Sequence, residues 1–307
     1  MLKTQTEEST KKDWMGNYHE EFQYLRLISE INTHGSMEEG RNGKAKTIFG
    51  SGMHFDLSDN KLPLLTTKKV AFKTCLKELL WFINGDTDNK ILKAQKVRIW
   101  NANGSRDFLD SRGLVNNEVD DLGPVYGHQW RYFNAKYDNC NTDYTGKGVD
   151  QLQNIIDQLK NPNTRNSRRL VMSAWNPEQL DEMALPPCHI LCQFCVTENN
   201  KLSCSLYQRS GDVGLGVPFN IASYSILTHL IAKHCGLEPK EFVYFLGNAH
   251  IYDDHIEVLK EQVTRKPYVF PKLNILCVKE NISDYVVKDF NLIDYKYHEK
   301  IKMEMRK

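Results

Sequence analysis

The sequence predicts one α+β domain, in which helices pack on a large mixed β-sheet. Segments with apolar residues at helical spacing are interspersed with runs that are rich in β-branched and aromatic residues. No internal repeat and no linker rich in Pro, Gly or Ser divides the chain. With 307 residues, 40% hydrophobic and 26% charged, the chain is long enough to bury a large core. We expect a polar, disordered leader over residues 1–16 and a single folded domain over residues 17–307.

Four helices are expected from apolar periodicity and from stop signals. The first starts at Phe22 and stops at Gly35. The longest begins after Pro218 and ends at Gly236 and Pro239, and it is apolar nearly all round, which indicates a buried central helix. The other two helices are expected at residues 71–83 and 149–160.

The strands are expected where β-branched and aromatic residues cluster. Two of these runs flank the turn-like sequence TENN and predict a β-hairpin. The predicted strands cover residues 46–57, 168–175, 189–196, 201–210 and 241–252.

The charge balance limits the classes of partner. Lys plus Arg number 40 against 39 for Asp plus Glu, so no general basic excess exists to bind nucleic acid or an anionic membrane. A bound phosphate would therefore depend on local arginines. No apolar run approaches the roughly 20 residues that span a bilayer, and the first residues lack the apolar core of a secretory signal. We expect a location in the cytosol or nucleus.

The chain has 8 cysteines, and without a secretory signal we expect them to be free thiols. The spacing of Cys188, Cys192 and Cys195 raises a zinc site as an alternative. On a strand, Cys188 and Cys192 share a face but lie about 13 Å apart, while Cys195 points to the other face. One tetrahedral ion could not bind all three, although a helix would place them on one side. We expect no metal.

The sequence LPPCHI presents a thiol and an imidazole directly after two prolines. Prolines fix the backbone, so Pro186 and Pro187 present Cys188 in a defined direction. The predicted hairpin returns Arg209 toward Cys188, where a guanidinium would favour the thiolate and bind an anion. The alternatives are that the Cys188–His189 pair is only packing and that Arg209 pairs with a surface carboxylate.

Glu78 lies on the face of the predicted helix that should be buried. Its neighbours at helical spacing are Cys75, Trp81 and Phe82. Because desolvation raises the pKa of a carboxyl group, Glu78 would suit a general acid or base near neutral pH. The alternative is a buried carboxylate that is satisfied by a local donor.

Further polar residues could bind a nucleotide. Asn220, near the start of the long helix, offers a donor and an acceptor that match a carbonyl beside an N–H, unless it is a helix cap. His250 and Tyr252 alternate onto one strand face and could bind a sugar hydroxyl, unless they only pack. Planar donors for a phosphate, which alone would more often be solvated, are Arg41, Arg168, Arg169 and Arg209.

The motifs occur together in an order that closely resembles the thymidylate synthase family, from about Phe22 to Met305. The motifs are PLLTTK, ELLWFINGDT, IWNANGSRDFLD, LGPVYGHQWR, SAWNP, LPPCH, LYQRSGD, GLGVPFNIASY and AHIY. The resemblance is to the eukaryotic branch, because of the insertion between Asn101 and Gly127. It implies reductive methylation of dUMP to dTMP, with 5,10-methylenetetrahydrofolate as co-substrate donating carbon and hydride, and no metal.

The resemblance also implies the role of each residue. Cys188 would attack carbon 6 of uracil, Glu78 and Asn220 would move protons at the base, and His189 and Tyr126 would complete the catalytic set. Nucleotide contacts are implied for Arg41, Gln208, Arg209, Ser210, Asp212, Asn220, His250 and Tyr252. Arg168 and Arg169 would reach in from the other subunit of an obligate homodimer with its sheets back to back. Folate contacts are implied for Ile99, Trp100, Asn103, Tyr126, Asp212, Leu215, Gly216 and Phe219.

The sequence departs from the family pattern at three places. The loop after Arg41 reads NGKAK and is one residue shorter, although Lys44 and Lys46 could compensate for the change. Asn101 and Asn248 stand where aspartate is common, so the hydrogen bonds around them must be rearranged. The tail KMEMRK replaces small apolar residues, and we expect Arg306 and Lys307 to weaken closure over the folate and to slow turnover.

Three alternative functions remain. A dUMP hydroxymethylase shares the early steps, whereas the dCMP enzyme would have aspartate in place of Asn220. A non-catalytic nucleotide-binding relative is a second alternative, but it would be expected to lose Cys188 first. A cysteine hydrolase is a third, although adjacent strand residues such as Cys188 and His189 point to opposite faces and form a poor dyad.

Overall fold

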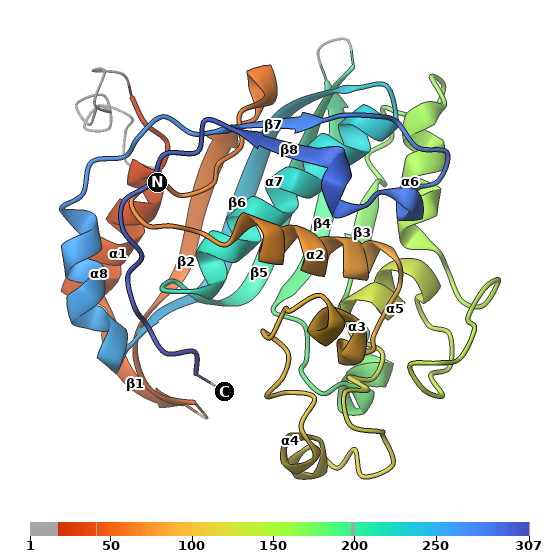
Figure 1. Cartoon of the computed structure of the whole chain (residues 1–307), viewed down its shortest axis with the longest axis horizontal. Helices are drawn as coiled ribbons and strands as arrows, with labels where there is room; N and C mark the ends of the chain where they lie inside the picture. Colours follow the sequence, from red (N-terminus) through yellow and green to blue (C-terminus); the bar gives the residue numbers. More distant parts are fainter. Residues whose placement is uncertain (1–17, 41, 198–199, 307) are drawn as a thin grey trace.

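A six-stranded mixed sheet runs through the part of the chain that the computed structural model describes, which is residues 18–40, 42–197 and 200–306 (Figure 1). The strand order is β1-β2-β6-β5-β4-β3, and every neighbouring pair is antiparallel except β5 and β6. The predicted mixed sheet and hairpin are thus confirmed, whereas the leader over residues 1–16 lies outside the described residues. The strands are β1 Ser36–Gly40, β2 Gly43–Asp56, β3 Val171–Ser173, β4 His189–Thr197, β5 Lys201–Asp212, β6 Glu238–Tyr252, β7 Lys272–Ile275 and β8 Phe290–Ile293.

Helix α7, Gly216–His234, lies against β5 and β6, and α2, Phe72–Ile83, packs on α7 in turn (Figure 1). Nearly every side chain of α7 is buried, as its apolar sequence predicts. Helix α1, Phe22–His34, packs on β2 and on α8, Ile256–Val263. The other helices are α3 Asn89–Ala94, α4 Arg106–Ser111, α5 Tyr126–Tyr132 and α6 Gln151–Lys160, with 3-10 turns at Ser58–Asn60, Pro177–Glu182, Asp253–His255, Ile282–Asp284 and Val287–Asp289.

The four predicted helices are present, and α7 differs at its start. It begins at Gly216, before Pro218, because a proline in the first turn removes an N–H that has no helical partner anyway. It ends at His234, and Gly236 follows with φ +68°, a conformation that favours glycine.

One predicted strand is shorter in the structure, and strands β1, β7 and β8 lie where the sequence predicts none. The run over residues 168–175 contains only the short strand β3, Val171–Ser173. Strand β1, Ser36–Gly40, was not predicted, because all of its residues are exposed and no apolar alternation marks it.

Strand β4 carries a register shift between His189 and Leu191 that the sequence pattern does not reveal. The expected alternation from Cys188 to Cys192 is therefore interrupted, and His189 is buried as Cys192 is. Beyond the shift, Cys192 is buried and Cys195 is exposed, on opposite faces as expected. This arrangement does not favour a zinc site built on the three cysteines.

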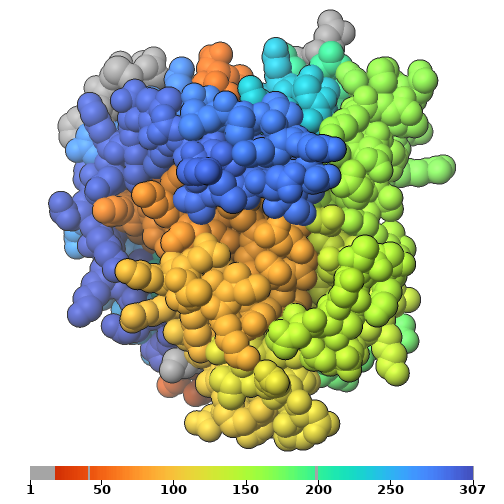
Figure 2. Space-filling model, turned by 45° about the vertical axis from the view of Figure 1, so that its right-hand side comes forward, coloured from red at the N-terminus to blue at the C-terminus, as the bar shows by residue number. Residues whose placement is uncertain are grey.

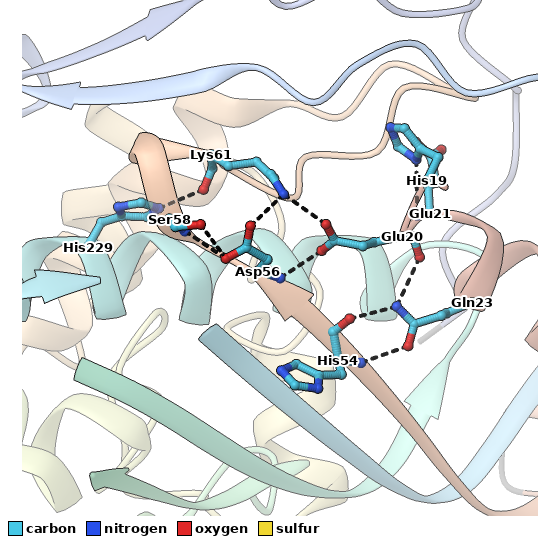
Figure 3. Close-up of polar contacts among 9 residues, drawn as sticks. All are labelled: His19, Glu20, Glu21, Gln23, His54, Asp56, Ser58, Lys61 and His229. Atoms are coloured by element: carbon cyan, nitrogen blue, oxygen red, sulfur yellow. Dashed lines mark hydrogen bonds and ion pairs between the residues drawn. The ribbon is translucent and has the colours of Figure 1, made fainter. Parts of the chain in front are cut away.

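A polar network fastens the start of α1 to the end of β2 (Figure 3). The Lys61 ammonium contacts Glu20 Oε1 at 2.9 Å and Asp56 Oδ2 at 2.7 Å, and the Asp56 N–H donates to Glu20 Oε2 at 2.7 Å. The backbone of His54 exchanges two hydrogen bonds with the Gln23 amide. The network lies at the end of β2, where Asp56 pairs with Glu241 near the start of β6.

Two segments outside the six-stranded sheet lie at opposite ends of the molecule. The loop that carries α4 protrudes at the lower edge of the molecule, and the β7–β8 hairpin covers the opposite end (Figure 2). In the described part of the chain, no helix combines the length and apolarity that crossing a membrane requires.

Candidate active site

Cys188 and Arg209 meet at the start of the β4–β5 hairpin. The Arg209 N–H donates to the Cys188 carbonyl at 2.9 Å, and its guanidinium lies 3.8 Å from Cys188 Sγ. The guanidinium also donates to the carbonyls of Pro187 at 2.8 Å and Pro186 at 3.0 Å. The return of Arg209 to the thiol, predicted from the hairpin, is confirmed. The two prolines therefore have two roles. Their carbonyls accept hydrogen bonds from Arg209, and their rigid backbone directs Cys188.

Tyr126 contacts the backbone of Cys188, and His189 packs on Tyr126. The Tyr126 hydroxyl accepts the Cys188 N–H at 2.8 Å, and its ring stacks on His189 with centroids 4.0 Å apart. His189 Nδ1 lies 2.8 Å from the hydroxyl of Tyr224, on α7. Burial lowers the pKa of His189 to about 3, so its ring is neutral at physiological pH.

Glu78 is buried on α2, as its helical position predicts. Oε1 accepts a 2.8 Å hydrogen bond from the indole N–H of Trp100. Desolvation raises the pKa of Glu78 to about 7, and the Trp100 hydrogen bond opposes this shift only in part. A carboxyl group with this pKa is divided between its acid and base forms near neutral pH.

Aromatic contacts connect Glu78 to the thiol. The Trp100 ring lies 6.2 Å from the Tyr126 ring in an edge-on arrangement, and Tyr126 bonds to Cys188. Phe82, one turn after Glu78 on α2, packs against Tyr126 at 4.9 Å. Glu78 and Cys188 therefore belong to one continuous cluster, although 110 positions separate them in the sequence.

Strands β5 and β6 carry the next group of predicted residues side by side. Ser210 pairs with Asn248, and Asp212 pairs with His250. The rings of His250 and Tyr252 are 5.2 Å apart and edge-on, as expected for two residues on one strand face. Ser210, Asp212, His250 and Tyr252 are all half-buried.

Asp212 shapes the loop between β5 and α7. Its Oδ1 accepts the N–H groups of Gly214 at 2.8 Å and Leu215 at 3.3 Å, and within the described residues its second oxygen makes no hydrogen bond. The Tyr24 hydroxyl, on α1, donates to the carbonyl of Val213 in the same loop at 2.8 Å.

Lys68 binds the same loop at Gly214, the residue after Val213. Its ammonium donates to the Gly214 carbonyl, and burial lowers the pKa of Lys68 to about 8. Hydrogen bonds from the Tyr24 and Lys68 side chains therefore hold the loop in the chain alone.

Asn220 is the fifth residue of α7, and the residue before the helix is Leu215. The interpretation of Asn220 as a helix cap is therefore wrong. Its half-buried side-chain amide makes no hydrogen bond within the described part of the chain. Its Oδ1 lies 3.9 Å from the position that a Cβ on Gly216 would take, which is an ordinary van der Waals contact.

Gln208 is oriented differently from its neighbours. It is only 2% exposed, its Nε2 donates to the Ser210 carbonyl at 2.8 Å, and its Oε1 accepts the Tyr244 hydroxyl at 2.6 Å. These bonds leave one N–H of the amide for a ligand, so Gln208 mainly supports the strand that carries Ser210.

Arg168 and Arg169 are not near Cys188 in this chain. Leu170, which follows them, accepts a hydrogen bond from Phe194, six residues along β4 from Cys188. At about 3.3 Å per residue, this separation is roughly 20 Å. Both arginines are exposed. Arg41, predicted for the same phosphate, lies outside the described residues.

The predicted folate residues lie on either side of the Glu78–Tyr126 cluster. Trp100 is buried, and the Phe219 carbonyl accepts a 3.5 Å contact from the thiol of Cys75 on α2. The half-buried members of this group are Ile99, Asn103, Asp212, Leu215, Gly216 and Phe219.

Asn101 lies beside a network of polar side chains. The Asn89 amide lies 3.4 Å from Asn101 Oδ1 and donates at 2.8 Å to Asp120, which also pairs with Lys93 at 2.6 Å. Asp120 has φ +77°, in the left-handed region that favours glycine. The carboxylate of this network is thus supplied by Asp120, next to the segment that carries Trp100.

The segment before the last residue packs beside Tyr252. Arg306 pairs with Asp253 at 3.1 Å and Asp254 at 3.0 Å, and its guanidinium lies 5.8 Å from the centre of the Tyr252 ring. The Glu304 carbonyl lies 2.8 Å from Nε2 of the buried His255. Lys307 lies outside the described residues.

Two residues of the cluster were not among the predicted site residues. Tyr224 bonds to His189, and Trp175 lies under the Arg209 guanidinium at 5.7 Å. Tyr224 is the one tyrosine of α7, and a buried tyrosine hydroxyl usually finds a hydrogen-bond partner. Neither contact is local in sequence, so the spacing of residues does not reveal it. Across the described ranges, no three His, Cys, Asp or Glu side chains are grouped so that they could hold a metal.

Comparison with known proteins identifies the family. Residues 22–307 match the thymidylate synthase family. The chain is 54% identical to the thymidylate synthase of Homo sapiens, over 94% of this chain and 91% of the human protein. It is 53% identical to the bifunctional dihydrofolate reductase-thymidylate synthase of Plasmodium chabaudi, over 94% of this chain and 49% of that protein. The chain belongs to the thymidylate synthase family.

The length of the matched region differs among these relatives. The chain covers 63% of the bifunctional protein of Paramecium tetraurelia, to which it is 50% identical, and about half the length of the Plasmodium relatives. In each case the match covers nearly all of this chain.

Proposed function

We propose that this chain catalyses the reductive methylation of dUMP to dTMP, with 5,10-methylenetetrahydrofolate as co-substrate and dihydrofolate as the second product. The observation that carries the proposal is the Cys188 thiol, which lies 3.8 Å from the Arg209 guanidinium and belongs to one cluster with the buried Glu78. Membership of the thymidylate synthase family supports it.

Cys188 acts as the nucleophile. Its carbonyl accepts the Arg209 N–H and its own N–H is bound by Tyr126, so both sides of its backbone are fixed. The neighbouring guanidinium favours the thiolate form. The sulfur attacks carbon 6 of the uracil, and carbon 5 then gains the enolate character that it needs to accept a one-carbon unit. A fixed approach places the sulfur at a near-attack distance, which lowers the entropic part of the barrier.

Glu78 and Asn220 act on the base. Because the pKa of Glu78 is about 7, its carboxyl group can hold a proton and release it at the pH of the reaction. The unpaired amide of Asn220 donates to a carbonyl and accepts from the adjacent N–H of uracil. A cytosine ring would present an amino group instead, which the amide matches less well.

The phosphate and the sugar are bound beside β5 and β6. Two of the Arg209 nitrogens contact the Pro186 and Pro187 carbonyls, which leaves Nη1 for the phosphate together with the Ser210 hydroxyl. His250 and Tyr252 bind the deoxyribose. Arg41 contributes to the same phosphate, as in the family.

The residues around Asp212 and Trp100 would hold the folate. When bound, 5,10-methylenetetrahydrofolate supplies the one-carbon unit and the hydride. The second oxygen of Asp212, which has no partner within the described residues, accepts an N–H of the pterin. Leu215, Phe219 and Ile99 are half-buried apolar residues that suit a flat ring, and Trp100 and Tyr126 form the floor beside them.

We also propose that two copies of the chain form a homodimer with their sheets back to back. Tyr207 lies between the buried Leu206 and Gln208, so it points to the other face of the sheet. Leu191 and Phe245 flank it on the adjacent strands, and the three side chains are 38% to 48% exposed. A row of large apolar side chains on an otherwise uncovered sheet face favours association.

The dimer also accounts for the two remaining arginines. Arg168 and Arg169 precede the edge strand β3, beside the part of β4 that lies three residues beyond Leu191. They are exposed, and neither side chain has a partner within the described part of the chain. We propose that they bind the phosphate in the partner subunit.

A cysteine hydrolase is disfavoured by the environment of His189. Its ring is stacked on Tyr126, its Nδ1 is occupied by Tyr224, and burial lowers its pKa to about 3. A ring with so low a pKa is a poor general base for a thiol. His189 instead supports the cluster that holds Cys188.

Release of tritium from dUMP labelled at carbon 5, in the presence of 5,10-methylenetetrahydrofolate, tests the proposed function. We expect release to depend on both substrates and to disappear in Cys188→Ala, with an unchanged circular dichroism spectrum. Thymidylate as the product separates the methylation from hydroxymethylation of dUMP. No release at saturating substrates would refute the proposal.

A further inference from the structure

The side chains of Asn248 and His250 form a hydrogen bond along β6. His250 Nδ1 lies 3.0 Å from Asn248 Oδ1. An amide oxygen carries no hydrogen and only accepts, so the imidazole must donate. The hydrogen of the His250 ring is therefore on Nδ1, and in the neutral ring Nε2 carries a lone pair.

We propose that Asn248 is a positioning residue that fixes His250 as the neutral Nδ1–H tautomer, so that Nε2 accepts a hydrogen bond from the deoxyribose hydroxyl of the nucleotide. The inference rests on the proposed function, in which His250 binds the sugar of dUMP. It assigns a role to the uncharged side chain of Asn248. A carboxylate at this position would have a different effect on the protonation of His250.

The surroundings of His250 favour the neutral ring. Burial lowers the pKa of His250, while Asp212, opposite it on β5, and a hydrogen bond with Asn248 oppose this shift without reversing it. The residue opposite on β2 is Thr47, which does not ionise. Lys46, next to Thr47, directs its ammonium to the Asn32 carbonyl of α1 at 2.7 Å.

The remaining neighbours limit the motion of the ring. Tyr252 packs edge-on against His250 at 5.2 Å, and His255 and Arg306 lie on Tyr252 at 5.8 Å. The first turn of α7, which packs on β6, contributes Asn220, which is uncharged. Among the described residues, Asp212 is therefore the charged group that acts on the His250 ring.

An aspartate at position 248 would change the charge but not the shape. Its carboxylate would accept the same hydrogen from Nδ1, but the negative charge at about the same distance would favour the imidazolium. An imidazolium carries hydrogens on both nitrogens, so Nε2 could no longer accept from the sugar hydroxyl. Asn248 thus accepts the hydrogen of Nδ1 without a negative charge that would favour the imidazolium at low pH.

Two measurements on the full chain test the proposal. Nitrogen-15 NMR of the histidine rings in the free protein, with His250 assigned by comparison with His250→Asn, gives the tautomer and the pKa. Calorimetric titration with dUMP between pH 6 and pH 8 gives the binding constant without any need for turnover. We expect the Nδ1–H tautomer in the unsubstituted chain and a dUMP affinity that changes little over this range.

In Asn248→Asp we expect the His250 pKa to rise into the measured range, so that the affinity for dUMP falls on acidification by up to about tenfold per pH unit below that pKa. Asn274→Asp, which adds the same charge at an exposed position of β7, should behave as the unsubstituted chain does. An Nε2–H tautomer, or equal dUMP affinity of Asn248→Asp at pH 6 and pH 8, would overturn the inference.

The outcomes separate this inference from the function on which it rests. Failure of the unsubstituted chain to bind dUMP would refute the proposed function, and with it the ligand assigned to Nε2. Binding of dUMP together with the wrong tautomer would refute only the role of Asn248.

Discussion

The indole N–H of Trp100 donates a 2.8 Å hydrogen bond to Glu78 inside the folded chain, and this bond does not cancel the cost of burying the carboxylate. The pKa of Glu78 is raised from 4.5 to about 7. The ionised form is therefore penalised in the folded state only, and this penalty increases as the pH rises from 4.5 to 7.

Glu78→Gln should make the protein more stable at pH 8 and inactive. The glutamine can still accept from Trp100 but never ionises, so the variant lacks the penalty, which is on the order of 3 kcal/mol above pH 7. Urea unfolding at pH 4.5 and pH 8 measures it, and the gain over the unsubstituted chain should appear only at the higher pH. An equal gain at both values would show that the carboxylate is not perturbed as described.

Arg209→Ala should make Cys188 less reactive. Loss of the guanidinium removes the charge beside the sulfur and the bonds to the Pro186 and Pro187 carbonyls. Alkylation of Cys188 by iodoacetamide at pH 7, followed by mass spectrometry, should slow by roughly tenfold. Arg209→Lys should slow it less, because the charge remains while the fork is lost. The exposed Arg98→Ala is the control, and identical rates in all variants would exclude the guanidinium as the activating group.

Subunits of two inactive variants should restore activity when they exchange. In a heterodimer of Cys188→Ala and Arg168→Ala, one site has the intact thiol of one chain and the intact arginine of the other. Random pairing of equal amounts should therefore recover about a quarter of the activity of the unsubstituted chain. The mixture of Cys188→Ala with the double variant Cys188→Ala, Arg168→Ala contains no intact site and serves as the control. Absence of recovery in the first mixture would argue that each site is complete within one chain.

Arg306→Ala should speed turnover if, as we propose, residues 301–306 close over bound folate. The ion pairs of Arg306 with Asp253 and Asp254 hold this segment beside Tyr252, and they must break for it to move. Because exposed ion pairs are weak, we expect a gain in kcat of severalfold at most. Steady-state kinetics with varied folate measures it. A lower kcat would instead mean that Arg306 assists closure.

The sequence predicts those parts of the site that depend on local patterns. Helical spacing places Glu78 on the buried face of α2, and the hairpin returns Arg209 to Cys188. Resemblance to the family supplies the assignments that spacing alone leaves open, such as the choice between substrate contact and packing for His250.

Features that depend on tertiary contacts or on single insertions are not visible in the sequence. The register shift in β4 changes the side on which His189 lies, and no alternation pattern reveals a shift of one residue. Tyr224 reaches His189 from another element, and Asp120 supplies the carboxylate near Asn101 from a left-handed backbone position. The position of Arg168 relative to Cys188 follows from strand pairing, which only the folded sheet fixes.

The account depends most directly on a covalent bond between Cys188 and carbon 6 of the nucleotide. Incubation with 5-fluoro-dUMP and 5,10-methylenetetrahydrofolate, followed by mass spectrometry of the digested protein, tests this bond. We predict an adduct on the peptide that contains Cys188, dependent on the folate and absent in Cys188→Ala. An unmodified Cys188 in a folded protein that binds both molecules would contradict the account.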